Sequence, residues 1–440
     1  MKNNRMTRRK FIQLTSMSAA GFVIGCKENP ATGEKQFMIV SEDKEIQIDK
    51  QQSPHQFSSD YGILQDKALN TYISKVGRML VPKTHRPDMP YSFQGVNATY
   101  INAYAFPGGS IAVTRGILLR LDNEAELAAL LGHELGHVNA RHTAQQMSKR
   151  QLTSLAVWGI TEYVSRKHSK YTQMAEKLGM LGAGALLASY SRDNEREADA
   201  LGNEYLVQTG YSTAGFVGLM EMLNSLSKRK SGITDLLFAT HPMSDERYKA
   251  AVESADTKYQ SSQNRPLKKE RYMDNMSGLR AIKGAIMKMQ KGEIAMARQK
   301  YDAAETYFQN ALKQSPEDYA ALLMMSKCLI AQGKHARAGQ YVSQAKQISP
   351  REAQAYHLSG FTEIKTKNFE SAYKDFRICE KLLPGNPNSA FFKGLALEGM
   401  QRKRDAATEY NRYLQATKKG DQAKHAYRRL VDWGYVNPGK

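Results

Sequence analysis

A period of 34 residues runs through the last third of this 440-residue chain, and it restricts the fold more than any other feature. Proline, small and bulky residues each recur at a constant phase along it. The sets are Pro316, Pro350 and Pro384; Ala304, Ala338, Ala372 and Ala406; Phe308, Val342, Phe376 and Tyr410; and Ala311, Ala345, Cys379 and Tyr413. Small residues let neighbouring helices approach, bulky ones fill the groove between them, and proline ends the second helix of a pair. The pattern predicts stacked helix pairs.

This period, with its small, large and proline positions, is the tetratricopeptide signature. We expect repeats at residues 285–318, 319–352, 353–386 and 387–420, with a capping helix that ends near Gly434. Cys379 takes a small-residue packing position, which favours a buried thiol over chemistry there. Residues 280–440 contain 28 Lys and Arg against 15 Asp and Glu. A basic groove between the repeats would suit acidic or C-terminal peptide segments.

Composition and charge narrow the class of protein. Apolar residues make up 41% and charged residues 24% of the chain, which is typical of a globular protein of two or three domains and excludes collagen-like or wholly disordered chains. Three cysteines cannot form a disulfide framework. No apolar run reaches the roughly 18–20 residues that cross a bilayer, and the apolar segment 178–188 is too short to span one. The net charge of +20 favours an anionic partner: nucleic acid, anionic lipid or acidic protein.

The N-terminus has the arrangement of an export signal. Basic residues between Lys2 and Lys10 precede a moderately apolar stretch, 11–25. The sequence around Cys26 resembles a bacterial lipobox, in which the cysteine is lipidated; a buried cysteine in an ordinary signal peptide is the alternative. Residues 7–12 resemble a twin-arginine signal, so the export route stays open. Export removes nucleic acid as the natural partner. We expect a periplasmic lipoprotein anchored in a membrane, the outer membrane rather than the inner.

The middle of the chain contains a metal-binding motif. One long helix is expected over residues 123–149, with Asp122 able to cap it. Within it, His133, Glu134 and His137 form an HExxH motif. Histidines four residues apart lie on one face of a helix and can reach a single Zn²⁺. Glu134 is then placed to take a proton from a water on the metal. A chance HExxH on a helix surface is the alternative, and the apolar residues around the motif argue against it.

A catalytic zinc site needs a third protein ligand. A later acidic segment supplies Glu195, Glu197 and Asp199. Glu195 and Asp199 share one helix face, so one can bind the metal while the other accepts a hydrogen bond from a ligand imidazole. Spacing alone does not decide between Glu195 and Glu197 as the ligand. His142 lies beyond His137 without ligand spacing, and we expect a structural hydrogen-bonding role for it.

An HExxH motif followed some 60 residues later by Glu-x-x-x-Asp resembles the Oma and CAAX-prenyl-protease family of zinc metallopeptidases. Further segments that match are 29–33, 102–109 with 110–114, and 240–242 with Arg247. The resemblance implies that Glu195 is the third ligand of one Zn²⁺ per chain and that Asp199 is its hydrogen-bonding partner. It covers about residues 29–249, half of the chain.

The resemblance also implies roles beyond the ligand set. His241 and Arg247 are expected to assist catalysis, against the plainer interpretations of a cap before Pro242 and a surface ion pair. A neutral His241 could instead occupy the fourth position on zinc and act as a latch. Residues Ser110 to Thr114 are expected to form an edge strand. By the resemblance, an extended substrate adds its main chain to that edge, with Gly109, Ser110, Ile111 and Ala112 as the substrate-binding residues. Such a site selects unfolded chain.

The predicted fold is therefore mainly α: an α+β zincin-type metallopeptidase domain with a small edge-strand sheet, followed by an all-α tetratricopeptide solenoid. The expected divisions are a lipoprotein signal peptide at 1–25, the peptidase at 26–255, a polar linker at 256–279 and the repeats at 280–440.

The predicted function is zinc-dependent hydrolysis of unfolded or misassembled envelope proteins. The repeats would recruit these clients or the machinery that assembles outer-membrane β-barrels, and the lipid anchor would hold the chain at a membrane. The alternative is a lipid-anchored scaffold or chaperone-like assembly factor whose zinc site is largely latent.

Overall fold

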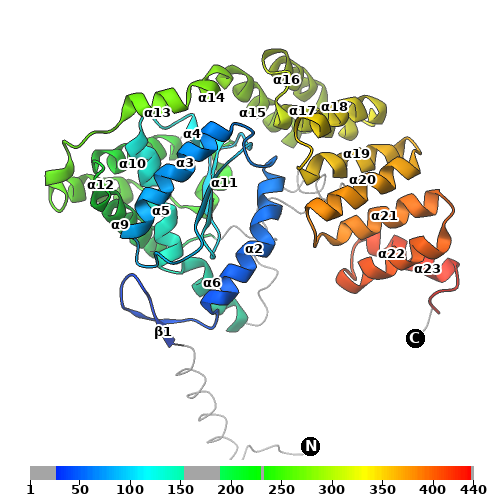
Figure 1. Cartoon of the computed structure of the whole chain (residues 1–440), viewed down its shortest axis with the longest axis horizontal. Helices are drawn as coiled ribbons and strands as arrows, with labels where there is room; N and C mark the ends of the chain where they lie inside the picture. Colours follow the sequence, from blue (N-terminus) through cyan, green and yellow to red (C-terminus); the bar gives the residue numbers. More distant parts are fainter. Residues whose placement is uncertain (1–25, 153–188, 229–231, 438–440) are drawn as a thin grey trace, which may run out of the picture.

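The computed structural model describes residues 26–152, 189–228 and 232–437, so the predicted signal peptide and the apolar segment 178–188 lie outside it. Helices surround a small sheet in the first part, and helix pairs follow one another in the second (Figure 1). The elements of the first part are β1 (Cys26–Glu28), β2 (Lys35–Phe37), α2 (Glu42–Ser59), α3 (Lys67–Leu80), η1 (Val81–Lys83), β3 (Ser92–Val96), β4 (Ala103–Ala105), β5 (Ser110–Thr114), α4 (Arg115–Leu118), α5 (Glu124–Asn139), α6 (His142–Leu152), α9 (Arg192–Gln208), α10 (Ala214–Ser227), α11 (Asp235–Thr240) and α12 (Asp245–Asp256).

The prediction of an edge strand at Ser110–Thr114 is wrong, because β5 is the central strand of the sheet. The strand order is β3-β5-β4. β5 pairs in parallel with β3, from Ser92 opposite Ser110, and antiparallel with β4, where Tyr104 lies opposite Ala112. Ile111, Ala112 and Val113 are fully buried. A continuous buried run is typical of a strand with neighbours on both sides, and the weak alternation in the sequence did not reveal it.

The single helix predicted at 123–149 is two helices, α5 and α6. The chain turns at Arg141, whose φ of 59° is left-handed, and α6 starts at His142. The Arg141 guanidinium is held by the Glu45 carboxylate and by the Val40 carbonyl, at 3.1 and 2.9 Å. These distant partners stabilise a conformation that a non-glycine residue seldom adopts. The N-cap of α5 is Asn123, which accepts a hydrogen bond from the Glu126 N–H, and the predicted cap Asp122 was one residue too early.

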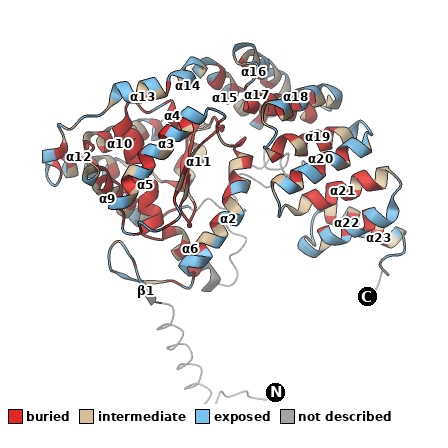
Figure 2. Cartoon of the chain, in the orientation of Figure 1, coloured by how far each residue is buried: buried red, intermediate tan, exposed pale blue. Residues whose placement is uncertain are grey.

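Every residue of α5 is buried, and it forms the centre of the first part of the molecule (Figure 2). It packs against α3, α9, α10 and β4. The contact with α9 is close because glycines lie there. A Cβ added to Gly202 would lie 2.7 Å from the main-chain nitrogen of His133, and one added to Gly136 would lie 2.8 Å from the Ala198 carbonyl oxygen. Small residues at this contact let the two helix backbones approach.

The predicted linker at 256–279 is packed against the domain instead of extending from it. It contains η2 (Gln260–Ser262), α13 (Lys269–Asn275) and α14 (Ser277–Ala281). Tyr272 and Met276 are fully buried, and the Tyr272 hydroxyl donates to the Leu118 carbonyl at 2.6 Å. Two large side chains anchor a segment whose overall composition is polar, which composition alone does not reveal. The domain boundaries themselves stay a prediction.

The predicted helix pairs are present in the second part of the chain, which confirms the tetratricopeptide architecture. Phe308, Phe376 and Tyr410 pack directly over glycines of the preceding helices, where an added Cβ would lie 2.3–2.7 Å from the ring. The alanines at the small positions are fully buried, and Cys328 and Cys379 are buried thiols. The helices are α15 (Lys283–Ala297), α16 (Tyr301–Gln314), α17 (Tyr319–Ala331), α18 (His335–Ile348), α19 (Ala353–Lys365), α20 (Phe369–Leu382), α21 (Pro387–Gly399), α22 (Lys403–Ala416) and the capping helix α23 (Asp421–Asp432).

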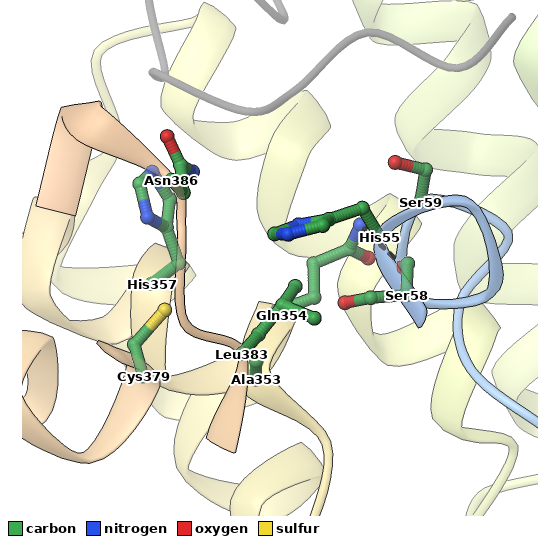
Figure 3. A pocket seen from close by; sticks show the side chains of 9 residues that line it. All are labelled: His55, Ser58, Ser59, Ala353, Gln354, His357, Cys379, Leu383 and Asn386. Atoms are coloured by element: carbon green, nitrogen blue, oxygen red, sulfur yellow. Dashed lines mark hydrogen bonds between the residues drawn. The ribbon is translucent and has the colours of Figure 1, made fainter. Parts of the chain in front are cut away.

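The repeats are fastened to the first part through buried polar contacts. Arg115 and Asp318 form an ion pair of 2.5 Å between two side chains that are at most 4% exposed. The Gln354 amide of α19 donates to the Ser58 carbonyl at the end of α2, at 3.0 Å. His55 and Ser58 from α2 face Gln354 and His357 across a cavity of about 30 Å³ (Figure 3). That volume admits one water molecule. The end of α2 therefore lies against the repeats.

Candidate metal centre

Three elements bring four metal-binding side chains together. His133 and His137 come from α5, Glu195 from the first turn of α9, and His241 from the residue that ends α11. One ligand atom from each lies within 4.8 Å of every other. The two α5 imidazoles are 3.1 Å apart at their Nε2 atoms, and Glu195 Oε1 lies 3.4 Å from His137 Nε2. All four side chains are buried.

The structure places His241 inside this cluster. Its Nδ1 lies 3.0 Å from Glu195 Oε1 and 3.5 Å from His133 Nε2. Its Nε2 lies 3.9 Å from Glu134 Oε1. His241 is thus as close to the predicted ligand atoms as they are to one another. Sequence spacing could not show this, because α11 reaches the site from more than a hundred residues further along the chain.

Asp199 and Arg247 support the cluster from one side. Asp199 Oδ1 lies 3.0 Å from His133 Nδ1, the contact that the sequence predicted for this carboxylate. Arg247 binds Asp199 through Nε and Nη2 at 2.6 and 2.7 Å, while its Nη1 lies 2.6 Å from Glu195 Oε2. Nη1 also donates to the Pro242 carbonyl. The guanidinium is therefore occupied by the residues around it. Its predicted action on the reacting carbonyl stays a prediction, and the geometry seen here is that of a positioning residue.

The two glutamates that spacing left as alternatives have separate environments. Glu195 is fully buried in the cluster. Glu197 turns the other way and accepts hydrogen bonds from His142 Nε2 at 3.1 Å and Asn29 Nδ2 at 2.6 Å. His142 in turn lies 2.9 Å from His137 through the two Nδ1 atoms. The geometry favours Glu195 as the ligand, as the resemblance implied.

Burial and charge set the protonation of the cluster. Burial lowers the pKa of His137 well below its usual value, which keeps the imidazole neutral and able to bind a metal. Burial alone would raise the pKa of Glu195, but His241, His137 and Arg247 outweigh it and hold this pKa well below its usual range. Burial raises the pKa of Glu134, a shift that makes its carboxylate a better proton acceptor.

Sequence reasoning missed one residue of this site, Tyr190. Its ring stacks on the His137 imidazole, with centroids 3.7 Å apart and planes 18° from parallel. The hydroxyl hydrogen-bonds with Thr143 at 3.0 Å, and the main-chain N–H donates to the Thr240 carbonyl. Tyr190 thus links α6, α9 and α11 around the cluster. Its position directly before the capping residue Ser191 of α9 is the signal that could have indicated it.

The donor set fits a divalent transition metal. Imidazole nitrogens with one carboxylate are the ligands of catalytic zinc sites. Glu134 Oε2 is buried and has no hydrogen-bond partner among the described residues, as expected of a base that faces a metal and its water. These observations fit the metal centre predicted from the motif.

Residues 67–255 match Peptidase family M48, and residues 295–360 match the tetratricopeptide repeat. The first part of the chain is a Peptidase family M48 domain. The prediction of an Oma-type metallopeptidase with C-terminal repeats is thereby confirmed.

Curated relatives resemble this chain over part of their length. The beta-barrel assembly-enhancing protease of Yersinia pestis is 29% identical over 304 residues, which are 63% of this chain and 61% of the relative. The protein of the same name in Escherichia coli K12 is 29% identical over 208 residues, 47% of this chain and 41% of the relative. Metalloprotease YcaL of Escherichia coli K12 is 35% identical over 159 residues, which are 36% of this chain and 59% of the relative. The match thus spans less than two thirds of each relative.

Proposed function

We propose that this chain is a zinc-dependent endopeptidase that hydrolyses unfolded or misassembled proteins of the bacterial envelope. The observation that carries the proposal is the buried cluster of His133, His137 and Glu195, with the Glu134 carboxylate beside it. Zinc bound there would polarise the scissile carbonyl and lower the pKa of a water. Glu134 would accept the proton of that water and return it to the leaving amine.

The substrate would bind at β4, not at β5 as the sequence suggested. Within the described residues β4 pairs with β5 alone, so its other side is an edge. The Thr114 N–H bonds the Asn102 carbonyl, and the Phe106 N–H bonds the Ser110 carbonyl. By the alternation of antiparallel ladders, the main chain of Ala103 and Ala105 points away from β5. Ala105 also lies near His137 and Tyr190, around a gap too small for a water molecule. An extended peptide added at this edge would run beside the cluster.

The place of action is proposed from the relatives and the N-terminus. Two relatives are named for β-barrel assembly, which supports the bacterial envelope, with the repeats recruiting clients or the assembly machinery. None of the helices in the described ranges is long and apolar enough to cross a membrane. Anchoring would come from lipid on Cys26. Labelled palmitate on the wild type but not on Cys26→Ser tests this anchor, and its absence from both contradicts it.

One observation supports the alternative, a lipid-anchored assembly factor with a latent site. His241 occupies space among the ligand atoms, and all the side chains around it are buried. A site closed in this way would hydrolyse little until His241 moves.

Metal analysis and casein cleavage separate the two functions. We expect His133→Ala, His137→Ala and Glu195→Ala to lose zinc, because each removes a ligand. Glu134→Gln should keep stoichiometric zinc and lose hydrolysis, since the amide cannot accept the proton. A wild type that holds zinc but cleaves neither casein nor the envelope proteins that the Glu134→Gln variant traps in cells would favour the assembly factor. Zinc retained by Glu195→Ala would move the third ligand elsewhere.

A further inference from the structure

Behind His137, a line of hydrogen bonds leads away from the metal cluster to the N-terminal segment, and hydrolysis as proposed above does not use it. His137 Nδ1 lies 2.9 Å from His142 Nδ1, and His142 Nε2 lies 3.1 Å from Glu197 Oε2. Glu197 Oε1 accepts from Asn29 Nδ2 at 2.6 Å. His137 and His142 are each 1% exposed and Asn29 is 5% exposed, whereas the Glu197 side chain between them is 25% exposed.

The line has one consistent direction of donation. His137 Nε2 faces His133 and Glu195. If this atom binds the metal, the ring proton of His137 stays on Nδ1. Nδ1–H then donates to His142 Nδ1, which leaves the His142 proton on Nε2 to donate to the Glu197 carboxylate. His142 thus accepts one hydrogen bond and donates one, while His137 donates one and keeps the lone pair of Nε2 for the metal. A hydrogen bond of this kind fixes the tautomer and orientation of a ligand histidine and raises its basicity.

A break in the helix between His137 and His142 makes this hydrogen bond possible. On a continuous helix, residues five apart point about 140° away from each other. The left-handed turn at Arg141 breaks the helix and returns His142 to the face of His137. That turn is held by Glu45 on α2, not by local sequence.

Asn29 is held in place by its own loop. Its side-chain oxygen accepts from the Ala31 N–H at 2.9 Å, which aims the amide nitrogen at Glu197. Its main chain bonds Gly33 and Glu34 within the hairpin of β1 and β2. The hairpin docks on α6, where Gln36 accepts from Gln145. Cys26, the candidate lipidation site, is the first residue of β1, three residues before Asn29.

We propose that Asn29, Glu197 and His142 are positioning residues for the metal ligand His137, so that the N-terminal hairpin is a working part of the metal site. The inference rests on the proposed zinc function. The family resemblance singled out the segment 29–33 without a role, and the inference gives it one. Its asparagine holds the carboxylate that orders the two imidazoles.

Zinc affinity, measured on the full chain by competition with a chelator, tests this inference without relying on activity. Asn29→Ala and Glu197→Ala should each weaken zinc binding by roughly 10–100-fold, the usual effect of removing such a partner. The double variant should bind little more weakly than Glu197→Ala alone, since Asn29 acts through Glu197. The matched control is Gln36→Ala, which loosens the hairpin at Gln145 without touching the line. It should bind zinc like the wild type.

Unfolding of the metal-free proteins separates positioning from mere stability. Asn29→Ala should lose zinc affinity out of proportion to any change in the metal-free melting temperature. A lower melting temperature with unchanged affinity, additive losses in the double variant, or an equal loss in Gln36→Ala would overturn the inference alone. A wild type that binds no zinc would instead overturn the proposed function together with it.

Discussion

At the scale of single residues, the site depends on which way each acid of α9 points. Residues two apart on a helix point about 160° away from each other, so Glu195 and Glu197 cannot face the same partner. Glu195 faces α5 and is fully buried among His137, His241 and Arg247. Glu197 faces α6 and the N-terminal hairpin. One short segment thus supplies a ligand and the support for another ligand.

His241 is the residue whose removal has the most informative effect. It fills space between Glu195 and His133, where a water and substrate would have to enter, so we expect His241→Ala to raise the basal rate of peptide hydrolysis. Turnover of a short peptide at equal zinc occupancy measures this, with Glu134→Gln as the inactive control. A loss of roughly 10²–10³ in kcat would instead identify His241 as a donor to the oxyanion. An unchanged rate would leave it a structural residue.

At the scale of elements, the cluster exists because the main chains of α5 and α9 are in close contact. His133 and His137 share a helix, but Glu195 reaches them only when the second backbone approaches within contact of the first. Gly202 of α9 lies against the main chain of Gly132 and His133, and Gly136 of α5 lies against Ala198. The separation of the two helices is thus set by small residues that lie beside the metal ligands in the sequence: Gly132 and Gly136 precede His133 and His137.

A methyl group at this contact should disturb metal binding. The Cβ of Gly202→Ala would lie 2.7 Å from the main-chain nitrogen of His133 and 2.9 Å from the Gly132 carbonyl carbon. Main-chain atoms, unlike the end of a side chain, cannot rotate away from this contact. We expect a loss of about 1–3 kcal/mol in the free energy of unfolding, with reduced zinc content. Urea unfolding and metal analysis measure the two effects.

Gly339→Ala is the matched control for that substitution. It also lies within a helix, α18, but its Cβ would meet only the Thr362 hydroxyl at 3.7 Å. It should be neutral or stabilising by up to about 1 kcal/mol, since alanine is the better helix former. A Gly202→Ala protein as stable as this control, with full zinc, would contradict the importance of the close helix contact.

At the scale of the whole molecule, the repeats are not a separate module on a flexible tether. The end of α2 and the loop after it lie against α17 and α19: Lys327 stacks over the Tyr61 ring at 4.2 Å, and Gln354 binds the Ser58 carbonyl. Glu293 of α15 accepts hydrogen bonds from Thr99 and Tyr61. Part of the surface of the repeats is therefore covered by the first part of the chain.

This contact should depend on pH through Glu352, the residue before α19, whose carboxylate lies against Gly62 in the loop after α2. Burial raises the pKa of its carboxyl to about 7 from a usual value of 4.5. The folded protein therefore keeps a proton between about pH 4.5 and 7 that the unfolded chain has released. The stabilisation is present below pH 4.5 and is lost as the pH rises through 7.

Glu352→Gln should remove this loss, because the amide stays neutral at every pH. Its free energy of unfolding should exceed that of the wild type at pH 8 by on the order of 2 kcal/mol, and the difference should shrink towards pH 4.5. Denaturant unfolding at pH 8 and pH 5 measures it. The same difference at both pH values would show that the side chain, and not its charge, matters at this contact.

Local patterns in the sequence were enough for features whose parts lie close together along the chain. The helix pairs follow from residues such as Ala338 and Val342, because each repeat packs on its immediate neighbours and so repeats the same requirement every 34 residues. His133 and His137 could be paired because one helix turn brings them to the same face.

Only the tertiary structure decided the features that depend on distant parts of the chain. β5 is central because β4 returns to its far side, and the helix breaks at Arg141 because Glu45 holds the turn. Glu197 is bound by Asn29, 168 residues away. Each of these is a pairing between segments whose local sequences are equally compatible with another partner. Their choice is made by the free energy of burying the whole domain, which no local pattern contains.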